Sequence, residues 1–261
     1  MKCIKHITLG LVFLFSYMGT TLAQKSSGDF YQMRVYHMKS DSQVIRVDQY
    51  LSHALLPALH RLGIRPVGVF KPIANDTAAD KRIYVLLPFR SADQWNGLED
   101  KLVLNGTYQA AAKDFIAAPY DQAPFDRMES ILINAFSAHK RLTVPGKKNP
   151  ERVFELRSYE SPTFHLAERK QHMFNHGGEI GIFNRLKFDP VFYGEVASGS
   201  RMPNLMYMPI FDNVEARNAA WKVFGNDPKW KEISTDPVNE NKVSVDHIDS
   251  ILMHSTSYSD Y

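Results

Sequence analysis

The chain has 261 residues, of which 44% are hydrophobic and 12% aromatic, values typical of a globular protein and not of a disordered or fibrous one. Its formal net charge is +3, from 31 Lys and Arg against 28 Asp and Glu. Lys2 and Lys5 lie in a segment that we expect to be removed, which leaves 29 basic against 28 acidic residues. A nearly neutral chain with scattered charges argues against nucleic acid as a partner.

The first 23 residues resemble a secretory signal peptide. A charged start is followed by an apolar run, Ile7–Met18, and by small residues in Thr21–Ala23 that fit peptidase cleavage before Gln24. The run is short for a membrane span of ~20 residues, so we expect no span in the mature chain. Cys3, the only cysteine, would leave with the signal. We therefore predict an exported protein without disulfides, periplasmic or extracellular.

The first half is predicted to run strand, helix, strand, strand, helix, strand. Alternation in the first strand puts Met33 and Val35 on one face and Arg34 and Tyr36 on the other. Apolar residues at helical spacing mark the first helix, which Pro57 should kink or split. In chain order the elements are Phe30–Met38, Asp48–Leu62, Val67–Phe70, Arg82–Phe89, Ser91–Leu104 and Arg127–Ala135.

The second half repeats this order. Asp126–Ile133 returns as Asp246–Met253, and Tyr31–Tyr36 returns as Phe154–Tyr159, so two landmarks recur together and in sequence. The chain therefore contains a duplicated domain. In chain order the second set of elements is Val153–Tyr159, Leu166–Asn175 continued by Ile180–Leu186, Pro190–Val196, Leu205–Phe211, Asn213–Phe224 and Val245–His254.

The repeat defines the predicted domains and the fold class. Residues 30–136 form the first domain, 137–150 an exposed linker and 151–258 the second domain. Each domain is a ferredoxin-like βαββαβ unit whose sheet carries helices on one face only. The second copy is the obvious cover for the other face, which predicts an α+β barrel made by pairing the two units within one chain.

These residues resemble the NIPSNAP family. The resemblance lies in the aromatic-x-hydrophobic-Arg-x-Tyr first strand of each half, in the Asp-Ser-Ile-Leu last strand, and in Pro66–Phe70. It is closest in the second half, through Phe154–Tyr159, Met173–Asn175, Gly177–Ile180 and Met202–Leu205. The resemblance implies the dimeric α+β barrel superfamily, which includes small monooxygenases and haem-degrading enzymes. It implies no agreed reaction.

The first-strand arginines and tyrosines are the first candidate site. If the apolar residues of these strands face the helices, then Arg34, Tyr36, Arg157 and Tyr159 lie between the sheets, where an arginine needs a partner. One reading is a structural pair with Glu129, Asp249 or Glu155. The other is a ligand oxygen held by the arginine and tyrosine together.

Glu179 is the second candidate. It follows Gly177 and Gly178, which let the backbone approach closely, and it would act either as a ligand-facing base or as a helix N-terminal carboxylate. Tyr193 and Glu195 are two apart on one strand and therefore share a face. The first half has no obvious counterpart of these residues, so we expect any pocket in the second half.

Three histidines form the third candidate. His172 and His176 are four apart on a predicted helix, and His165 lies two turns before. The spacing could hold a metal or haem, but the glycines disturb the helix beside it, and surface histidines are the better reading. No metal and no cofactor are predicted, and the chain has no GxGxxG, P-loop, GxSxG or CxxC motif.

The predicted function is binding of a small, partly apolar molecule in or beside the second-half barrel. In enzymatic form it would be cofactor-independent oxygenase-like or isomerase-like chemistry, with Glu179 or His176 as base and Arg157 with Tyr159 stabilising the oxyanion. The alternative is an interaction module without chemistry, and haem binding ranks third. Further association between chains is left open.

Overall fold

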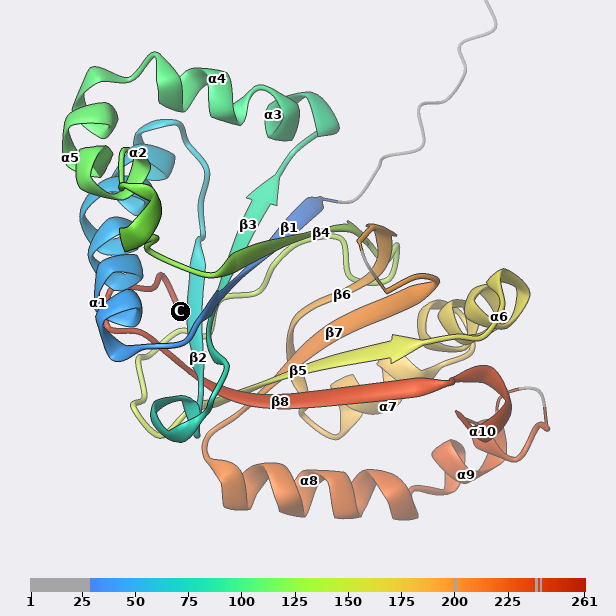
Figure 1. Cartoon of the computed structure of the whole chain (residues 1–261). Helices are drawn as coiled ribbons and strands as arrows, with labels where there is room; N and C mark the ends of the chain where they lie inside the picture. Colours follow the sequence, from blue (N-terminus) through green and yellow to red (C-terminus); the bar gives the residue numbers. More distant parts are fainter. Residues whose placement is uncertain (1–28, 200, 238, 240) are drawn as a thin grey trace, which may run out of the picture.

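The computed structural model describes residues 29–261 apart from positions 200, 238 and 240 (Figure 1). The predicted signal peptide, residues 1–23, lies outside the described residues. Within the described part, no helix has the length and apolar character needed to cross a lipid bilayer.

The strands form one closed antiparallel barrel in the order β1-β3-β2-β8-β5-β7-β6-β4. Within it, each half keeps the ferredoxin-like order, β4-β1-β3-β2 in the first and β8-β5-β7-β6 in the second. The predicted α+β barrel of two tandem units is confirmed. The strands are β1 (Phe30–Met38), β2 (Gly68–Pro72), β3 (Lys81–Phe89), β4 (Arg127–Ala135), β5 (Val153–Glu160), β6 (Asp189–Ser198), β7 (Asn204–Phe211) and β8 (His247–Ser255).

The two sheets join edge to edge. At one seam β2 pairs with β8, placing Phe70 opposite Ser255, and at the other β4 pairs with β6, placing Ile133 opposite Val196. Each seam removes an exposed strand edge from both halves. The duplication therefore supplies within one chain the partner that a single four-stranded sheet would otherwise lack.

The first helix of the first half begins earlier than predicted and contains a wider turn. It runs through α1 (Asp41–Tyr50), the π-helical segment η1 (Leu51–Leu55) and α2 (Leu56–Arg61). Ser40 caps it by accepting a hydrogen bond from the Gln43 backbone N–H. The Leu56 N–H bonds to the Leu51 carbonyl, one residue beyond the α-helical spacing, directly before Pro57. The helix therefore accommodates Pro57 without ending.

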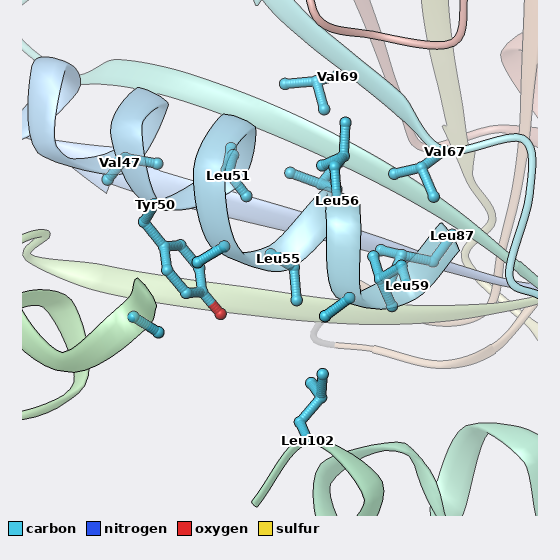
Figure 2. Close-up of a cluster of buried hydrophobic side chains, with 14 of the residues drawn as sticks. Val47, Tyr50, Leu51, Leu55, Leu56, Leu59, Val67, Val69, Leu87 and Leu102 are labelled. Carbon is cyan, nitrogen blue, oxygen red and sulfur yellow. The ribbon is translucent and has the colours of Figure 1, made fainter. Parts of the chain in front are cut away.

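These helices pack on the outer face of the first sheet. Figure 2 shows part of this buried cluster, in which Leu56 of the helix lies near Val69 and Leu59 near Leu87. The remaining helices of this half are η2 (Asn75–Thr77), α3 (Ala92–Asn96), α4 (Leu98–Val103), α5 (Gly106–Ile116) and η3 (Tyr120–Gln122).

The helices of the second half cover the opposite side of the barrel (Figure 1). Two of them are separated by the predicted glycine break, where Gly178 adopts a φ of 102° and precedes the next helix. A Cβ on Gly177 would lie 2.8 Å from the Met173 backbone, so this position requires glycine. The helices are α6 (Phe164–Asn175), α7 (Glu179–Arg185), α8 (Val214–Asn226), α9 (Pro228–Ser234) and α10 (Asn241–Ser244).

The predicted faces of the first strands are inverted. Met33, Val35 and Leu156 lie inside the barrel, whereas Tyr36 and Tyr159 lie beneath the helices. The prediction that the arginine–tyrosine pairs lie between the sheets was therefore wrong. Both faces of these strands are buried, so alternation shows which residues share a face but not which layer covers it.

One end of the barrel is filled by aromatic side chains. Tyr261, at the end of the chain, is 3% exposed and packs against Phe70 and Phe154 with ring centroids 5.5 and 6.1 Å apart. Tyr31 and Phe192 add a further contact at 5.8 Å. This end of the barrel is consequently a packed core, and open space inside the barrel lies toward the other end.

Candidate functional site

The second half differs from the first along one row of facing residues on the helix-covered side of its sheet. Arg157 pairs with Ser250 on β8 and with Tyr207 on β7, and Tyr207 pairs with Tyr193 on β6. In the first half the same row contains Ser130, Arg34, Val85 and Val69. Two tyrosines therefore replace two valines, which adds hydroxyl groups to an otherwise apolar layer.

Arg157 is held by a buried carboxylate. Its Nη1 donates to Glu155 Oε1 at 2.6 Å, and its Nη2 donates to the Tyr159 hydroxyl at 3.0 Å. Glu155 is fully buried and also accepts hydrogen bonds from Arg217 (2.6 and 2.9 Å), the Trp221 indole (2.7 Å) and Ser250 (2.7 Å). We call this set the Glu155 network.

The Glu155 network keeps its carboxylate ionised. Burial alone would raise the pKa of Glu155, but hydrogen bonds from Arg217, Ser250 and Trp221, together with the charge of Arg157, lower that pKa to about 2. Each oxygen of Glu155 has donors within 2.9 Å. This part of the site is a satisfied structural unit, as the pairing interpretation of Arg157 predicted.

A second buried ion pair lacks such support. Lys170 of α6 and Glu179 of α7 are each 2% exposed, and their Nζ and Oε2 atoms lie 3.8 Å apart, too far for a hydrogen bond. The other close neighbours of Lys170 Nζ are the Met173 sulfur at 4.0 Å and the rings of Phe174, Tyr159 and Trp230 at 5.3, 5.6 and 5.8 Å.

Burial opposes the charge on both members of this pair. It raises the pKa of Glu179 to about 7, although the charges of Lys170 and Arg157 act in the other direction. Burial also lowers the pKa of Lys170, opposed by Glu179. Glu179 is therefore the carboxyl of this layer that can change protonation near neutral pH.

Other polar atoms of the same layer also lack hydrogen-bond partners. They are Glu179 Oε2, Arg157 Nε and the Tyr193 hydroxyl. Arg157 and Tyr193 are both within electrostatic range of Glu179, and burial raises the pKa of Tyr193, so its hydroxyl stays protonated. We call Arg157, Lys170, Glu179 and Tyr193 the inner polar group. Buried polar atoms are normally hydrogen-bonded, so several unpaired ones in one layer indicate a place for a ligand or water.

An open cavity of about 670 Å³ lies at the surface beside α6 and α9, and its lining includes no member of the inner polar group. Met173 lines the cavity, and its sulfur lies 4.0 Å from Lys170 Nζ. One flexible thioether side chain thus contacts both the cavity and the inner polar group. The remaining lining residues are His165, Glu168, Arg169, His172, Gly177, Glu232, Ile233, Asp236 and Asn239.

The sequence model of the NIPSNAP family matches residues 154–260, a range that contains the whole inner polar group. The second half is a NIPSNAP domain. The match lies where the sequence resemblance was closest, and the predicted NIPSNAP resemblance is confirmed there.

Solved structures share the fold over most of the chain, across both halves. A putative monooxygenase from Lactobacillus acidophilus aligns with a TM-score of 0.56 at 14% identity over 87% of this chain and 94% of its own. A putative monooxygenase from Fusobacterium nucleatum aligns with a TM-score of 0.57 at 8% identity, over 88% of this chain and 93% of its own. An anthrone oxidase-like protein aligns with a TM-score of 0.51 at 9% identity, over 88% of this chain and 92% of its own. At these identities the likeness shows the fold alone. No curated protein matches the chain.

The NIPSNAP domain brings together four of the predicted site residues. Glu179, Arg157, Tyr159 and Tyr193 lie in one buried layer between sheet and helices. Glu179 also begins helix α7, as the helix-terminus reading predicted.

The other predicted site residues lie elsewhere. Glu195 and His176 are exposed and line a separate surface groove of about 300 Å³. His172 is exposed too, with its ring 5.4 Å from that of His176, and it lines both this groove and the cavity of about 670 Å³. Neither histidine faces the inner polar group.

Arg34 and Tyr36 occupy the corresponding layer of the first half. Arg34 Nε donates to Gln32 Oε1 at 3.0 Å and its Nη2 to Glu99 Oε1 at 2.8 Å, and Tyr36 packs against Phe115 and Phe125. These two residues therefore belong to the first-half core, not to the NIPSNAP domain.

Lys170 and Tyr207 were not predicted from the sequence. Lys170 stands three residues after buried Ala167 and four before buried Phe174, a position that helical spacing reserves for an apolar side chain. A lysine in an apolar stripe was the signal available. Tyr207 alternates with barrel-facing methionines, and only its pairing with Arg157 and Tyr193 reveals its role.

Proposed function

We propose that the NIPSNAP domain binds a small, partly apolar molecule carrying an acidic oxygen, such as a phenol or an enolisable ketone, at the inner polar group. The observation that carries the proposal is the buried Lys170–Glu179 pair, whose charged atoms stand 3.8 Å apart without a hydrogen bond. The fold shared with monooxygenase-like proteins is compatible with it.

The Lys170–Glu179 pair favours ligand binding because its loss of water on burial is not fully compensated by hydrogen bonds. Burying a lysine and a glutamate costs several kcal/mol each unless short hydrogen bonds offset the loss of water. A ligand oxygen beside Lys170 and Arg157 would supply such bonds, and the surrounding rings would contact the ligand's apolar part. The approximately 670 Å³ cavity beside Met173 offers a route of entry.

The same geometry supports proton transfer. With a pKa of about 7, ionised Glu179 accepts a proton from the O–H or an acidic C–H of the ligand, and the electron pair remains on the ligand as a phenolate or enolate. Lys170 and Arg157 would stabilise the resulting oxyanion. Returning the proton to another carbon would be an isomerisation, whereas an oxygenase would additionally consume molecular oxygen.

A non-catalytic role is the second candidate, favoured by the Glu155 network. Arg157 already makes short bonds to Glu155 and Tyr159, which a purely structural residue would also do. The binding role and the structural role make different demands on Glu179 and Lys170. Both residues are costly to bury, and leucine or methionine would pack equally well in their place, so a purely structural role does not explain them.

A thermal-shift titration with 1-naphthol and 4-hydroxybenzoate tests the proposal. We expect the wild-type protein to gain several degrees in melting temperature with one of them, consistent with mass-action stabilisation. Glu179→Gln and Lys170→Met should lose that gain while still melting cooperatively. Glu99→Gln, which removes an exposed partner of Arg34 in the first half, is the matched control. Equal gains in all four proteins would contradict the proposal.

We also propose that the protein is exported after cleavage before Gln24. The charged start, the apolar run and the small residues of positions 1–23 support this. Intact-mass analysis of the mature protein, expressed in a bacterium and recovered from its periplasm, should show a chain beginning at Gln24. Full-length chain confined to the cytoplasm would contradict export.

A further inference from the structure

A second cavity lies inside the barrel, on the other face of the sheet from the inner polar group. Its volume is about 90 Å³, and strands of both halves contribute to it. Apolar and polar residues contribute about equally to its walls, and Ser158 and Asn204 supply a hydroxyl and an amide. The apolar lining residues are Val35, Tyr84, Ile131, Leu156, Val196, Met206 and Ile251. We call this space the barrel chamber.

The barrel chamber is closed at its inner end. Beyond its walls lie Tyr31, Phe70 and Phe154, which belong to the same apolar core and are fully buried, with Tyr261 packed against them. The charged lining residues come instead from the opposite ends of the strands, such as His37 near the end of β1 and Arg127 at the start of β4. The chamber is thus a blind pocket with an apolar floor and a charged mouth.

Charged side chains of both signs line that mouth. Arg82, Arg127 and Arg201 line the chamber, against only two lining carboxylates, Glu129 and Asp249. Arg127 pairs with Glu129, and Arg201 pairs with Asp249. The side chains of Arg127 and Arg201 are 58% and 49% exposed, so these pairs are in contact with solvent and can exchange partners.

Two further carboxylates lie just outside the lining. Arg82 Nε donates to Asp80 Oδ2 at 2.7 Å, and Arg201 Nη1 lies 3.2 Å from Glu160 Oε1. Together with the lining residues these groups give the mouth alternating charges. The positive charges at the mouth are already balanced by carboxylates. An entering anion would therefore have to replace one of these carboxylates beside an arginine.

His37 is a buried residue at the mouth, between the carboxylates of Asp80 and Glu129. It is 4% exposed, and its Nδ1 is 2.9 Å from Asp80 Oδ1. Its Nε2 lies 3.0 Å from Glu129 Oε1, the distance of an ion pair, although the alignment falls short of a hydrogen bond. A ligand carboxylate at the position of Glu129 would therefore contact His37 as well as Arg127.

From these observations we propose that the barrel chamber is a second binding site, which takes a short-chain carboxylate. The alkyl tail would lie among Leu156, Met206 and Ile251, and the carboxylate would take the place of Glu129 between Arg127 and His37. An apolar cavity of ~150 Å³ holds benzene, so about 90 Å³ accommodates roughly four heavy atoms beyond the mouth. Butyrate fits this size and has the required charge.

Methionine-methyl NMR tests the site directly, because each cavity has its own reporter. Met206 lines the barrel chamber and Met173 lines the cavity of the NIPSNAP domain. Titrating butyrate at constant ionic strength should shift the Met206 methyl with about millimolar affinity, while the Met173 methyl stays in place. A shift at Met173 without one at Met206 would overturn the proposal and point to the NIPSNAP domain instead.

Charge and position are tested by matched ligands and variants. Butanol and butylamine should bind at least fivefold more weakly than butyrate, and equal binding of either would overturn the carboxylate assignment. Arg127→Gln should weaken butyrate binding by about fivefold or more, whereas Lys229→Gln, which breaks an exposed pair on α9, should leave it unchanged. Filling the chamber by Val196→Phe should abolish the Met206 shift in a protein that still folds. Unchanged butyrate binding in both chamber variants would contradict the assignment.

Discussion

Equivalent arginines of the two halves show how a single neighbour changes the chemistry of a strand. Arg34 is held by neutral Gln32 and by Glu99, whose side chain is 67% exposed. Arg157 is held by Glu155, which is fully buried. The same arginine position thus has a solvent-screened carboxylate in one half and a desolvated one in the other.

Replacing the buried partner should therefore cost far more than replacing the exposed one. We expect Glu155→Gln to lower the free energy of unfolding by about 3 kcal/mol, because two arginines lose a buried counter-charge. Glu99→Gln should cost under about 1 kcal/mol. Urea denaturation of both variants at pH 7 provides the comparison. Similar losses would show that the Glu155 network is not a desolvated ion pair.

The raised pKa of Glu179 predicts a pH dependence of stability with a definite sign. The folded protein holds this proton with a pKa of about 7, against 4.5 for an ordinary glutamate, so in this window the folded state binds more protons than the unfolded state. The free energy of unfolding should consequently fall as pH rises from about 4.5 to about 7, by roughly 3 kcal/mol relative to Glu179→Gln. Parallel stability curves for the two proteins, measured by urea denaturation across that range, would contradict the assignment.

At the scale of elements, the α6–α7 corner positions Lys170 against Glu179. Gly177 leaves no room for a side chain beside Met173, and Gly178 adopts a positive φ. Gly181, inside α7, has neither constraint. The corner therefore depends on the first two glycines and not on the third.

Alanine substitutions separate these roles. Gly177→Ala should lower the free energy of unfolding by about 1–3 kcal/mol, because its Cβ would meet the Met173 backbone at 2.8 Å. Gly181→Ala should raise it by about 0.5–1 kcal/mol through better helix propensity. Thermal melts of the two variants suffice. If Gly177→Ala is no less stable than Gly181→Ala, then Gly177 does not lie as close to the Met173 backbone as the structure indicates.

The order of helices and strands could be predicted from the sequence, whereas the layer that each strand face packs against could not. The strand order and the glycine break followed from alternation and from Gly177–Gly178, because these signals are local. The side of the sheet to which Arg157 points was predicted wrongly, since both strand faces are buried by apolar partners. Lys170 was missed because its partner Glu179 lies on the next helix, and nothing in the sequence joins them except the corner between.

At the scale of the whole molecule, the β2–β8 and β4–β6 pairings close the barrel, so that each half covers the inner sheet face of the other. The second half alone would expose the edges of β6 and β8 and the apolar inner face that Met33 and Val35 now contact. A fragment starting at residue 151 should therefore associate with a second copy and close a barrel in the same way. Light scattering after size exclusion should give twice the fragment mass. A folded monomer at micromolar concentration would contradict this role of the seams.

The barrel also divides the molecule into two kinds of space. A single pocket is predicted in or beside the second-half barrel, but the structure separates the inner polar group from a barrel chamber that both halves build. Closing the barrel creates that chamber from residues such as Val35 and Leu156, which are far apart in the chain. No local pattern in the sequence could have shown it.

The most direct test of the central proposal is the titration of Glu179 itself. Carbon-13 NMR of glutamate carboxyls, with Glu179→Gln to assign the signal, should give a midpoint near pH 7, shifted further when 1-naphthol or 4-hydroxybenzoate binds. A midpoint near the ordinary value of 4.5, unmoved by either compound, would contradict the proposal that the NIPSNAP domain uses this buried carboxyl to bind and deprotonate a small acidic molecule.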